Sequence, residues 1–223
     1  MSTLLLIRHG ETPYNVNGKM AGRLPGVPLN DKGRKQAEAV GEALKNAPIK
    51  YIYSSPMERA LETGSYLAKN LGLEMLIAPG INETDIGEWT GRSVKQCART
   101  KLWDVVVNRP GELAFPGGES FAGIQARCVA EVEAIAARHP EDLVAVFSHA
   151  DPIKLVVAHY LNMPINSFQR LGADNCSICV IHFGKEGRIS VPKVNIVAGP
   201  VWPEVPAADP KKNGAAAKAK KDK

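Results

Sequence analysis

The feature that most constrains the fold is the alternation of short, continuous apolar runs with longer segments of helical periodicity. The first run, at residues 4–7, has four consecutive aliphatic residues and suits a central strand covered on both faces. Such alternation favours an α/β fold, a three-layer α/β/α sandwich with a mostly parallel central sheet. The predicted strands are residues 4–7, 49–53, 73–77, 143–147, 177–183 and 189–196, and the predicted helices are residues 31–45, 56–70, 120–138 and 152–161.

Three of these helices carry recognisable start signals. Asn30 is the expected N-cap of the first helix. Ser55 and Glu58 have the spacing of a capping box, with Pro56 at the first helical position of the second helix. Pro152 is expected to open the last helix.

Length and composition fit one globular domain followed by a tail. The 223 residues are 44 % hydrophobic and 23 % charged, which is ordinary for a globular protein. We expect a catalytic domain at residues 1–199 and a disordered, Pro/Ala/Lys-rich tail at residues 200–223. From Glu204 onward, six lysines against three acidic residues contribute +3 of the net charge of +5, which leaves +2 for the rest. Nucleic-acid binding by this tail is the less favoured alternative, because no aromatic residues are interleaved with the lysines.

The four cysteines predict neither a zinc site nor disulfides. Cys176 and Cys179 have the C-x-x-C spacing, but no second pair or histidine pair completes a zinc site. Both lie in a strand-like run, where positions three apart face opposite sides of a sheet. The apolar run at residues 4–7 is far too short for a signal peptide or a membrane span. We therefore expect a cytoplasmic protein with structural cysteines and no membrane partner.

Reactive polar residues follow three of the predicted strands. In open α/β sheets, ligands bind outside the carboxyl ends of the strands, so these residues are expected at one edge. Two arginines and two histidines beside helix N-termini are suited to phosphate, because the planar guanidinium matches the phosphate oxygens. The residues are Arg8 and His9 after the first strand, Ser54, Ser55 and Arg59 after the second, and Ser148 and His149 after the fourth.

Each of these residues taken alone has a plainer interpretation. A single histidine at a strand end is more often a hydrogen-bonded structural residue, and a single arginine is usually a surface charge. Arg8 is harder to explain in this way, because it directly follows four apolar residues and needs an anion or another partner if it is buried. The convergence at several strand ends, rather than any one residue, favours an anion site.

Four ordered motifs resemble those of the histidine phosphatase (phosphoglycerate mutase-like) superfamily, over residues 4 to about 160. A lone Arg-His-Gly would be weak evidence, whereas four motifs in the expected order are a specific match. They are Leu6-Ile7-Arg8-His9-Gly10-Glu11-Thr12 with Asn15, Ser54-Ser55-Pro56-Met57-Glu58-Arg59-Ala60, Ile81-Asn82-Glu83 with Gly87-Glu88-Trp89-Thr90-Gly91, and Phe147-Ser148-His149.

The resemblance implies a role for each matched residue. His9 is the expected nucleophile and becomes phosphohistidine, for which it must be a neutral imidazole. Glu83 is expected to protonate the leaving oxygen and then to deprotonate water, with Glu88 and Asp85 as rival carboxylates. The fixed positive charges make a metal or cofactor unnecessary. The expected phosphate or substrate contacts are Arg8, Asn15, Arg59, His149 and Ala150.

Two departures from the family pattern bear on the substrate. Ala150 and Asp151 stand where the family has glycines after the second histidine. Asp151 either caps the following helix or projects toward the pocket, where it would disfavour bisphosphates. Ile86 stands where mutases of this superfamily carry a tyrosine, and the chain has no adjacent arginine pair. Hydrolysis of small phosphorylated metabolites is therefore favoured, with a phosphoglycerate-type phosphomutase and a non-catalytic phosphoester-binding domain as alternatives.

The segment from residue 78 to residue 118 is expected to be irregular, with short helical pieces near Val94 and Trp103. It is the expected cap over the pocket. Its aromatic residues Trp89, Trp103 and Phe115 either line the pocket or pack in the core of a long loop. The pattern leaves open the physiological substrate and the oligomeric state, and Glu11 is equally compatible with a structural and a catalytic role.

Overall fold

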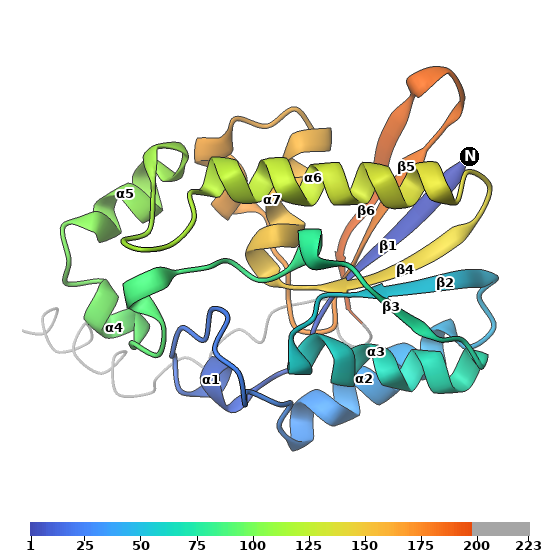
Figure 1. The fold of residues 1–223 in the computed structure, drawn as a ribbon, viewed down its shortest axis with the longest axis horizontal. Coiled ribbons are helices and arrows are strands. Elements are labelled where there is room, and N and C mark those ends of the chain that lie inside the picture. The colour runs from blue at the N-terminus through green and yellow to red at the C-terminus, as the bar shows by residue number, and fades with distance from the viewer. Residues whose placement is uncertain (198–223) are drawn as a thin grey trace, which may run out of the picture.

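A six-stranded sheet in the order β3-β2-β4-β1-β5-β6 runs through the middle of the computed structural model, which describes residues 1–197 (Figure 1). Strands β1, β2, β3 and β4 are mutually parallel, whereas β5 and β6 are antiparallel at one edge. The predicted mostly parallel sheet is therefore confirmed. The strands are β1 (Ser2–Arg8), β2 (Ile49–Ser54), β3 (Met75–Ile77), β4 (Leu143–Ser148), β5 (Ile178–Phe183) and β6 (Ile189–Ile196).

Helices cover both faces of the sheet, α2 and α3 on one side and α6 and α7 on the other (Figure 1). Three short helices lie in the connecting segments, and the 3-10 turns Pro79–Ile81 and Gly87–Trp89 flank the loop that carries Glu83. The helices are α1 (Pro13–Val16), α2 (Asp31–Leu44), α3 (Glu58–Leu71), α4 (Val94–Cys97), α5 (Leu102–Asn108), α6 (Phe121–Arg138) and α7 (Ala150–Tyr160).

The apolar run in β1 is continuous because both of its faces are buried. Leu4 and Leu6 pack with α6 and α7 in one core cluster. Leu5 and Ile7 point to the opposite face and pack with α2 and α3 in a second cluster. Alternate side chains of a strand face opposite sides of a sheet, so a strand between two helical layers has no solvent-facing position. Because β1 lies inside the sheet, the residue that follows it, His9, is also buried.

The start of α2 is as predicted, but the capping box at Ser55 is wrong. Asn30 caps α2 by accepting a hydrogen bond from the Gly33 backbone N–H at 2.8 Å. Helix α3 begins at Glu58, and its N-cap, Met57, makes no side-chain cap. The Ser55 hydroxyl instead lies 2.7 Å from the imidazole of His149. The Ser55 side chain thus contacts a residue distant in the sequence instead of forming the predicted cap of α3.

The expected start of the last helix at Pro152 is also wrong, by two residues. Helix α7 begins at Ala150, with His149 at the N-cap position. Asp151 thus lies inside the first turn and does not cap the helix. Of the two interpretations of Asp151, the structure supports the second, since this residue lines the pocket beside His9.

The interpretation of the cysteines as structural is consistent with their positions. All four are buried free thiols, and Cys176 and Cys179 pack into the two different core clusters, on opposite sides of the sheet. Trp89 lies 5.5 Å from Phe115 and 6.1 Å from Trp103 between ring centroids. These aromatic rings belong to the core packing of the long connection, and none of them lines the pocket in residues 1–197.

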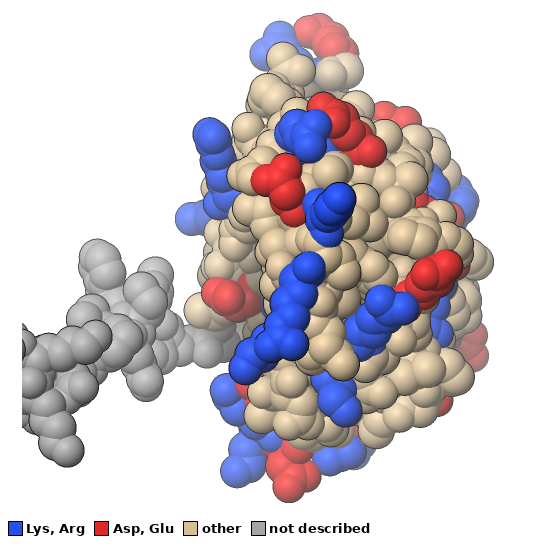
Figure 2. Space-filling model, turned by 90° about the vertical axis from the view of Figure 1, so that its left-hand side faces the viewer, with Lys and Arg blue, Asp and Glu red and all other residues tan. Residues whose placement is uncertain are grey.

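Charged side chains of both signs lie on the side of the molecule that Figure 2 presents. Figure 2 shows lysine and arginine side chains interspersed with acidic ones and with uncharged surface on the side that it presents. Within residues 1–197, no helix has the length and apolar character needed to cross a bilayer. The expected tail at residues 200–223 lies outside the described residues.

Candidate active site

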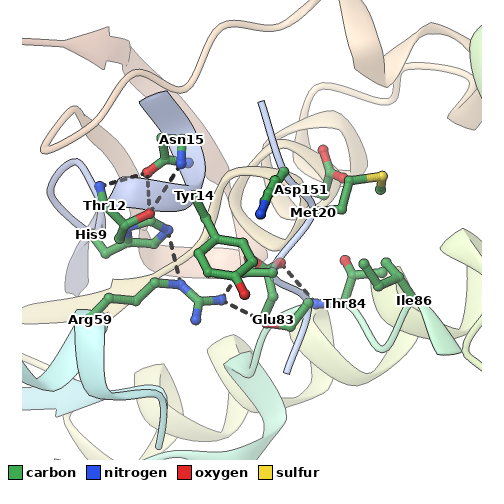
Figure 3. Close-up of a pocket in the computed structure, with 13 residues that line it drawn as sticks. His9, Thr12, Tyr14, Asn15, Met20, Arg59, Glu83, Thr84, Ile86 and Asp151 are labelled. Atoms are coloured by element: carbon green, nitrogen blue, oxygen red, sulfur yellow. Dashed lines mark hydrogen bonds and ion pairs between the residues drawn. The ribbon is translucent and has the colours of Figure 1, made fainter. Parts of the chain in front are cut away.

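The two histidines meet because their strands are neighbours in the sheet. Strands β1 and β4 are parallel, and Arg8 pairs with Ser148 at their carboxyl ends. The next residues, His9 and His149, therefore leave the sheet side by side, with ring centroids 5.2 Å apart. The predicted convergence of the strand ends therefore brings the two rings together, and His9 lines a pocket at this edge of the sheet (Figure 3).

His9 is held as a neutral imidazole with one nitrogen turned to the pocket. Its Nδ1 lies 2.7 Å from the Gly10 carbonyl oxygen, so this nitrogen carries the hydrogen and donates it. Its Nε2 accepts a hydrogen bond from Arg59 Nε at 3.3 Å. The pKa of His9 lies well below its ordinary value, because of burial and then the positive charges of Arg59 and Arg8. The Nε2 lone pair is thus available at neutral pH.

Three buried side-chain nitrogens around His9 have no hydrogen-bond partner in the described residues: Arg8 Nε, Arg59 Nη1 and His149 Nδ1. Both guanidinium groups are otherwise fixed by backbone carbonyls, Arg8 by Ala173 at 2.7 Å and Arg59 by Gly22 at 2.9 Å. Burying an unpaired donor costs about 1–3 kcal/mol, and more for a charged group. Such an arrangement suits an anion that offers several oxygen acceptors at once.

Glu83 is the carboxyl group beside these residues. Its Oε2 lies 3.2 Å from Arg59 Nη2 and 3.4 Å from His149 Nδ1, and its Oε1 accepts from the Thr84 backbone N–H at 2.9 Å. The pKa of Glu83 is raised, because burial outweighs the opposing charge of Arg59. A raised pKa favours the protonated form of this carboxyl group, which is the form that a general acid requires.

The other carboxylates considered from the sequence lie elsewhere. Glu88 is exposed, and the Asp85 side chain is 42 % exposed and accepts from the Gly87 backbone N–H. Glu11 binds Asn30 at 3.0 Å and Lys32 at 2.9 Å, outside the pocket that holds His9. Its contacts are those of a structural residue that ties the loop after β1 to α2.

Neither of the two other predicted phosphate contacts, Asn15 and Ala150, has a buried, unpaired side-chain nitrogen or oxygen among the described residues. Asn15 lines the pocket, while its Oδ1 accepts from the backbone N–H and the hydroxyl of Thr12, both at 3.0 Å. Ala150 is the first residue of α7, next to His149, and does not line the pocket. Phosphate contacts by Asn15 and Ala150 stay predictions.

Sequence analysis missed a second layer of charged residues behind Glu83. Arg127, on α6, donates to the carbonyl oxygens of Gly80 and Asn82, each at 2.8 Å, and of Glu83 at 3.1 Å. The carboxylate of Glu119 holds the same guanidinium, at 2.7 Å from Arg127 Nε. No local motif marks Arg127, because all three carbonyls lie more than forty residues away in the sequence.

The ligand atoms of His9, Glu83 and His149 lie within 4.8 Å of one another, close enough to share a metal ion. The Arg59 guanidinium, however, contacts both His9 and Glu83 at 3.2–3.3 Å. A cation at this point would meet that fixed positive charge directly. The donor set therefore fits an anion better than a metal.

Comparison with known proteins agrees with this geometry. The model of the histidine phosphatase superfamily (branch 1) matches residues 4–196. Phosphoserine phosphatase 1 of Hydrogenobacter thermophilus is 32 % identical over 201 residues, covering 88 % of this chain and 93 % of that protein. Glucosyl-3-phosphoglycerate phosphatase of Mycobacterium tuberculosis is 32 % identical over 178 residues, covering 76 % and 79 %.

The fold of a solved relative is also similar. The phosphoserine phosphatase of Entamoeba histolytica, a mutant solved in complex with phosphoserine, superimposes with a TM-score of 0.80 and 25 % identity. The match covers 87 % of this chain and 97 % of that one. The predicted resemblance is confirmed: the chain belongs to the histidine phosphatase superfamily.

Proposed function

We propose that this chain is a phosphomonoesterase that hydrolyses small phosphorylated metabolites through a phosphohistidine on His9. The observation that carries the proposal is the set of three unpaired nitrogens, Arg8 Nε, Arg59 Nη1 and His149 Nδ1, around a neutral His9. A phosphoryl group offers three oxygens and matches such a set in charge and in number of acceptors. The named phosphatases among the relatives support the same reaction class.

In the first step, the lone pair of His9 Nε2 attacks phosphorus as the bond from phosphorus to the ester oxygen breaks. Glu83, whose pKa is raised by burial, gives its proton to the departing oxygen. The attacking ring becomes positively charged, and the Gly10 carbonyl that accepts from Nδ1 stabilises this charge. Arg8, Arg59 and His149 bind the three phosphoryl oxygens throughout the transfer.

In the second step, water attacks phosphorus and the bond to His9 Nε2 breaks. The Glu83 carboxylate left by the first step takes a proton from this water, which restores its neutral form. Phosphate leaves, and His9 returns to a neutral imidazole. One carboxyl group serves as acid and then as base, with no net consumption of protein groups.

Hydrolysis is favoured over the mutase reaction. A mutase must retain a second anionic group of its substrate, whereas Ile86 and Asp151 line this pocket and offer an apolar surface and a negative charge. A non-catalytic binding role is also less favoured, because nucleophile, acid and phosphate donors are all in place. We further propose residues 1–199 as the catalytic unit, supported by the family match over residues 4–196. A cytoplasmic location stays a prediction.

Release of p-nitrophenol from p-nitrophenyl phosphate in the presence of EDTA tests the proposal. Wild type is expected to turn over, His9→Ala to lose activity, and His159→Ala, which removes an exposed histidine of α7, to behave as wild type. Rapid quench should trap an acid-labile phosphoryl group on wild type only. Absence of turnover in wild type, or its persistence in His9→Ala, would contradict the proposal.

A further inference from the structure

Beyond the phosphoryl site, the pocket has a mouth that carries both a negative and a positive side chain. We define the mouth by five lining residues outside the catalytic cluster: Tyr14, Lys19, Met20, Ile86 and Asp151. Figure 3 shows Tyr14, Met20 and Asp151 beside the group formed by His9, Arg59 and Glu83. Whatever is attached to the phosphate must extend among these side chains.

Asp151 presents a fixed carboxylate to this mouth. It lies in the first turn of α7, two residues after His149, and its side chain is 32 % exposed. Oδ1 pairs with Lys154 Nζ at 3.1 Å. Lys154 is itself only 12 % exposed and is held by Gln169 at 2.7 Å. The orientation of Asp151 is thus set by its neighbours, while no hydrogen bond to Oδ2 is found within residues 1–197.

The charge of Asp151 reaches the reacting groups. It adds to burial in raising the pKa of Glu83, and it opposes the burial that lowers the pKa of Arg8. A carboxylate this close disfavours a second anionic group of the substrate at the same place and attracts a cationic one. An ammonium next to the phosphate ester would meet this requirement.

Lys19 supplies the opposite charge from another part of the chain. Its backbone is fixed by a hydrogen bond from its N–H to the Tyr14 carbonyl at 2.9 Å and by a bridge to Ser93. Its ammonium lies 6.0 Å from the Tyr14 ring centroid. In the part of the chain that the structure describes, Lys19 forms no ion pair with Asp151 or with another carboxylate. It remains able to bind an anionic group of the substrate.

We propose that the mouth binds a zwitterion: an O-phosphorylated α-amino acid whose ammonium contacts Asp151 and whose carboxylate contacts Lys19. The proposal rests on the proposed phosphatase function and adds its substrate class. It sets these substrates apart from phosphate esters of sugars and sugar acids, which carry no ammonium for Asp151. A partly buried charge-assisted pair at Asp151 is worth about ten- to a hundredfold in kcat/KM. An exposed pair at Lys19 is worth about two- to fivefold.

Three esters separate the two contacts. In 3-phosphoglycerate a hydroxyl replaces the ammonium of O-phosphoserine, and in O-phosphoethanolamine the carboxylate is missing. For wild type we expect kcat/KM to be at least about tenfold higher for O-phosphoserine than for 3-phosphoglycerate. In Asp151→Asn, kcat/KM for O-phosphoserine should equal that for 3-phosphoglycerate. The ratio of kcat/KM for O-phosphoserine to that for O-phosphoethanolamine should stay as in wild type. Lys19→Met should lower only the second ratio.

Ratios within one variant are independent of the fraction of folded enzyme, so partial misfolding does not obscure them. Asp31→Asn is the matched control for Asp151, because Asp31 also lies in the first turn of a helix and pairs with the residue three positions later, Arg34. Lys95→Met, in the exposed helix α4, is the control for Lys19. Both controls are expected to keep the wild-type ratios.

The outcomes distinguish this proposal from the function on which it rests. Absence of turnover of p-nitrophenyl phosphate by wild type would contradict the phosphatase function itself. Turnover without a preference for O-phosphoserine over 3-phosphoglycerate would overturn the zwitterion proposal and leave the phosphatase function standing. A preference that survives Asp151→Asn would show that another group binds the ammonium and would overturn the assignment of the mouth.

Discussion

Replacing Arg127 by methionine tests whether the second layer of charged residues positions the acid. The guanidinium binds three carbonyl oxygens of the segment at residues 80–83 and the carboxylate of Glu119. Removing a half-buried charged donor that holds several acceptors typically destabilises a protein by about 1–3 kcal/mol. We expect Arg127→Met to lose this much in free energy of unfolding, measured by urea denaturation.

The catalytic effect of this change should depend on the leaving group. A positioned general acid contributes about 10²–10⁴-fold to the rate, but only where the departing oxygen needs a proton. An alkyl phosphate such as O-phosphoserine needs it, whereas p-nitrophenolate is stable without it. If Glu83 is displaced with its loop, kcat/KM should fall about 10²-fold or more for the alkyl ester and less than about tenfold for the aryl ester.

The assay is therefore kcat/KM for both esters in wild type, Arg127→Met, Arg127→Lys and Glu83→Gln. Arg127→Met should share the leaving-group dependence of Glu83→Gln, and Arg127→Lys should lie between it and wild type, because an ammonium cannot span three carbonyls. Arg138→Met, which removes an exposed arginine of the same helix, serves as the control. An equal loss for both esters in Arg127→Met would refute the positioning role and leave a purely structural one.

Three further predictions follow from the contacts of the site. Burial keeps His9 and His149 neutral in the folded protein, whereas both are protonated in the unfolded chain below about pH 6.5. The free energy of unfolding, measured by urea denaturation, should therefore fall by about 1–3 kcal/mol from pH 6.5 to 5.5. In His9→Gln this decrease should be smaller. Ser55→Ala removes the hydroxyl 2.7 Å from His149 Nε2 and should lower kcat about tenfold; an unchanged kcat would refute this role. Gly33→Ala would place a Cβ 2.1 Å from the Glu11 carbonyl oxygen and should cost about 1–3 kcal/mol, measured by urea denaturation; wild-type stability would show that α2 shifts freely.

Several elements of the fold could be predicted because their signals are local. Four consecutive aliphatic residues indicate that both faces of β1 are buried, and α2 begins at Asp31, directly after its predicted N-cap Asn30. The helical starts at Ser55 and Pro152 were predicted wrongly for the same physical reason. The Ser55 hydroxyl contacts His149 instead of capping α3, and α7 begins directly after His149. In both cases the tertiary arrangement overrides the local preference.

The sequence by itself determined the alternation of strands and helices, and with it the gathering of His9, Arg59 and His149 at one edge of the sheet. Parallel strands bring their carboxyl ends together whatever the detailed packing. Only the tertiary structure decided the hydrogen bond between Ser55 and His149, the contacts of Arg127 with the Glu83 loop and the position of Asp151 at the pocket. These contacts join segments that are distant in the sequence or depend on where a helix begins to within one turn, so no local pattern encodes them.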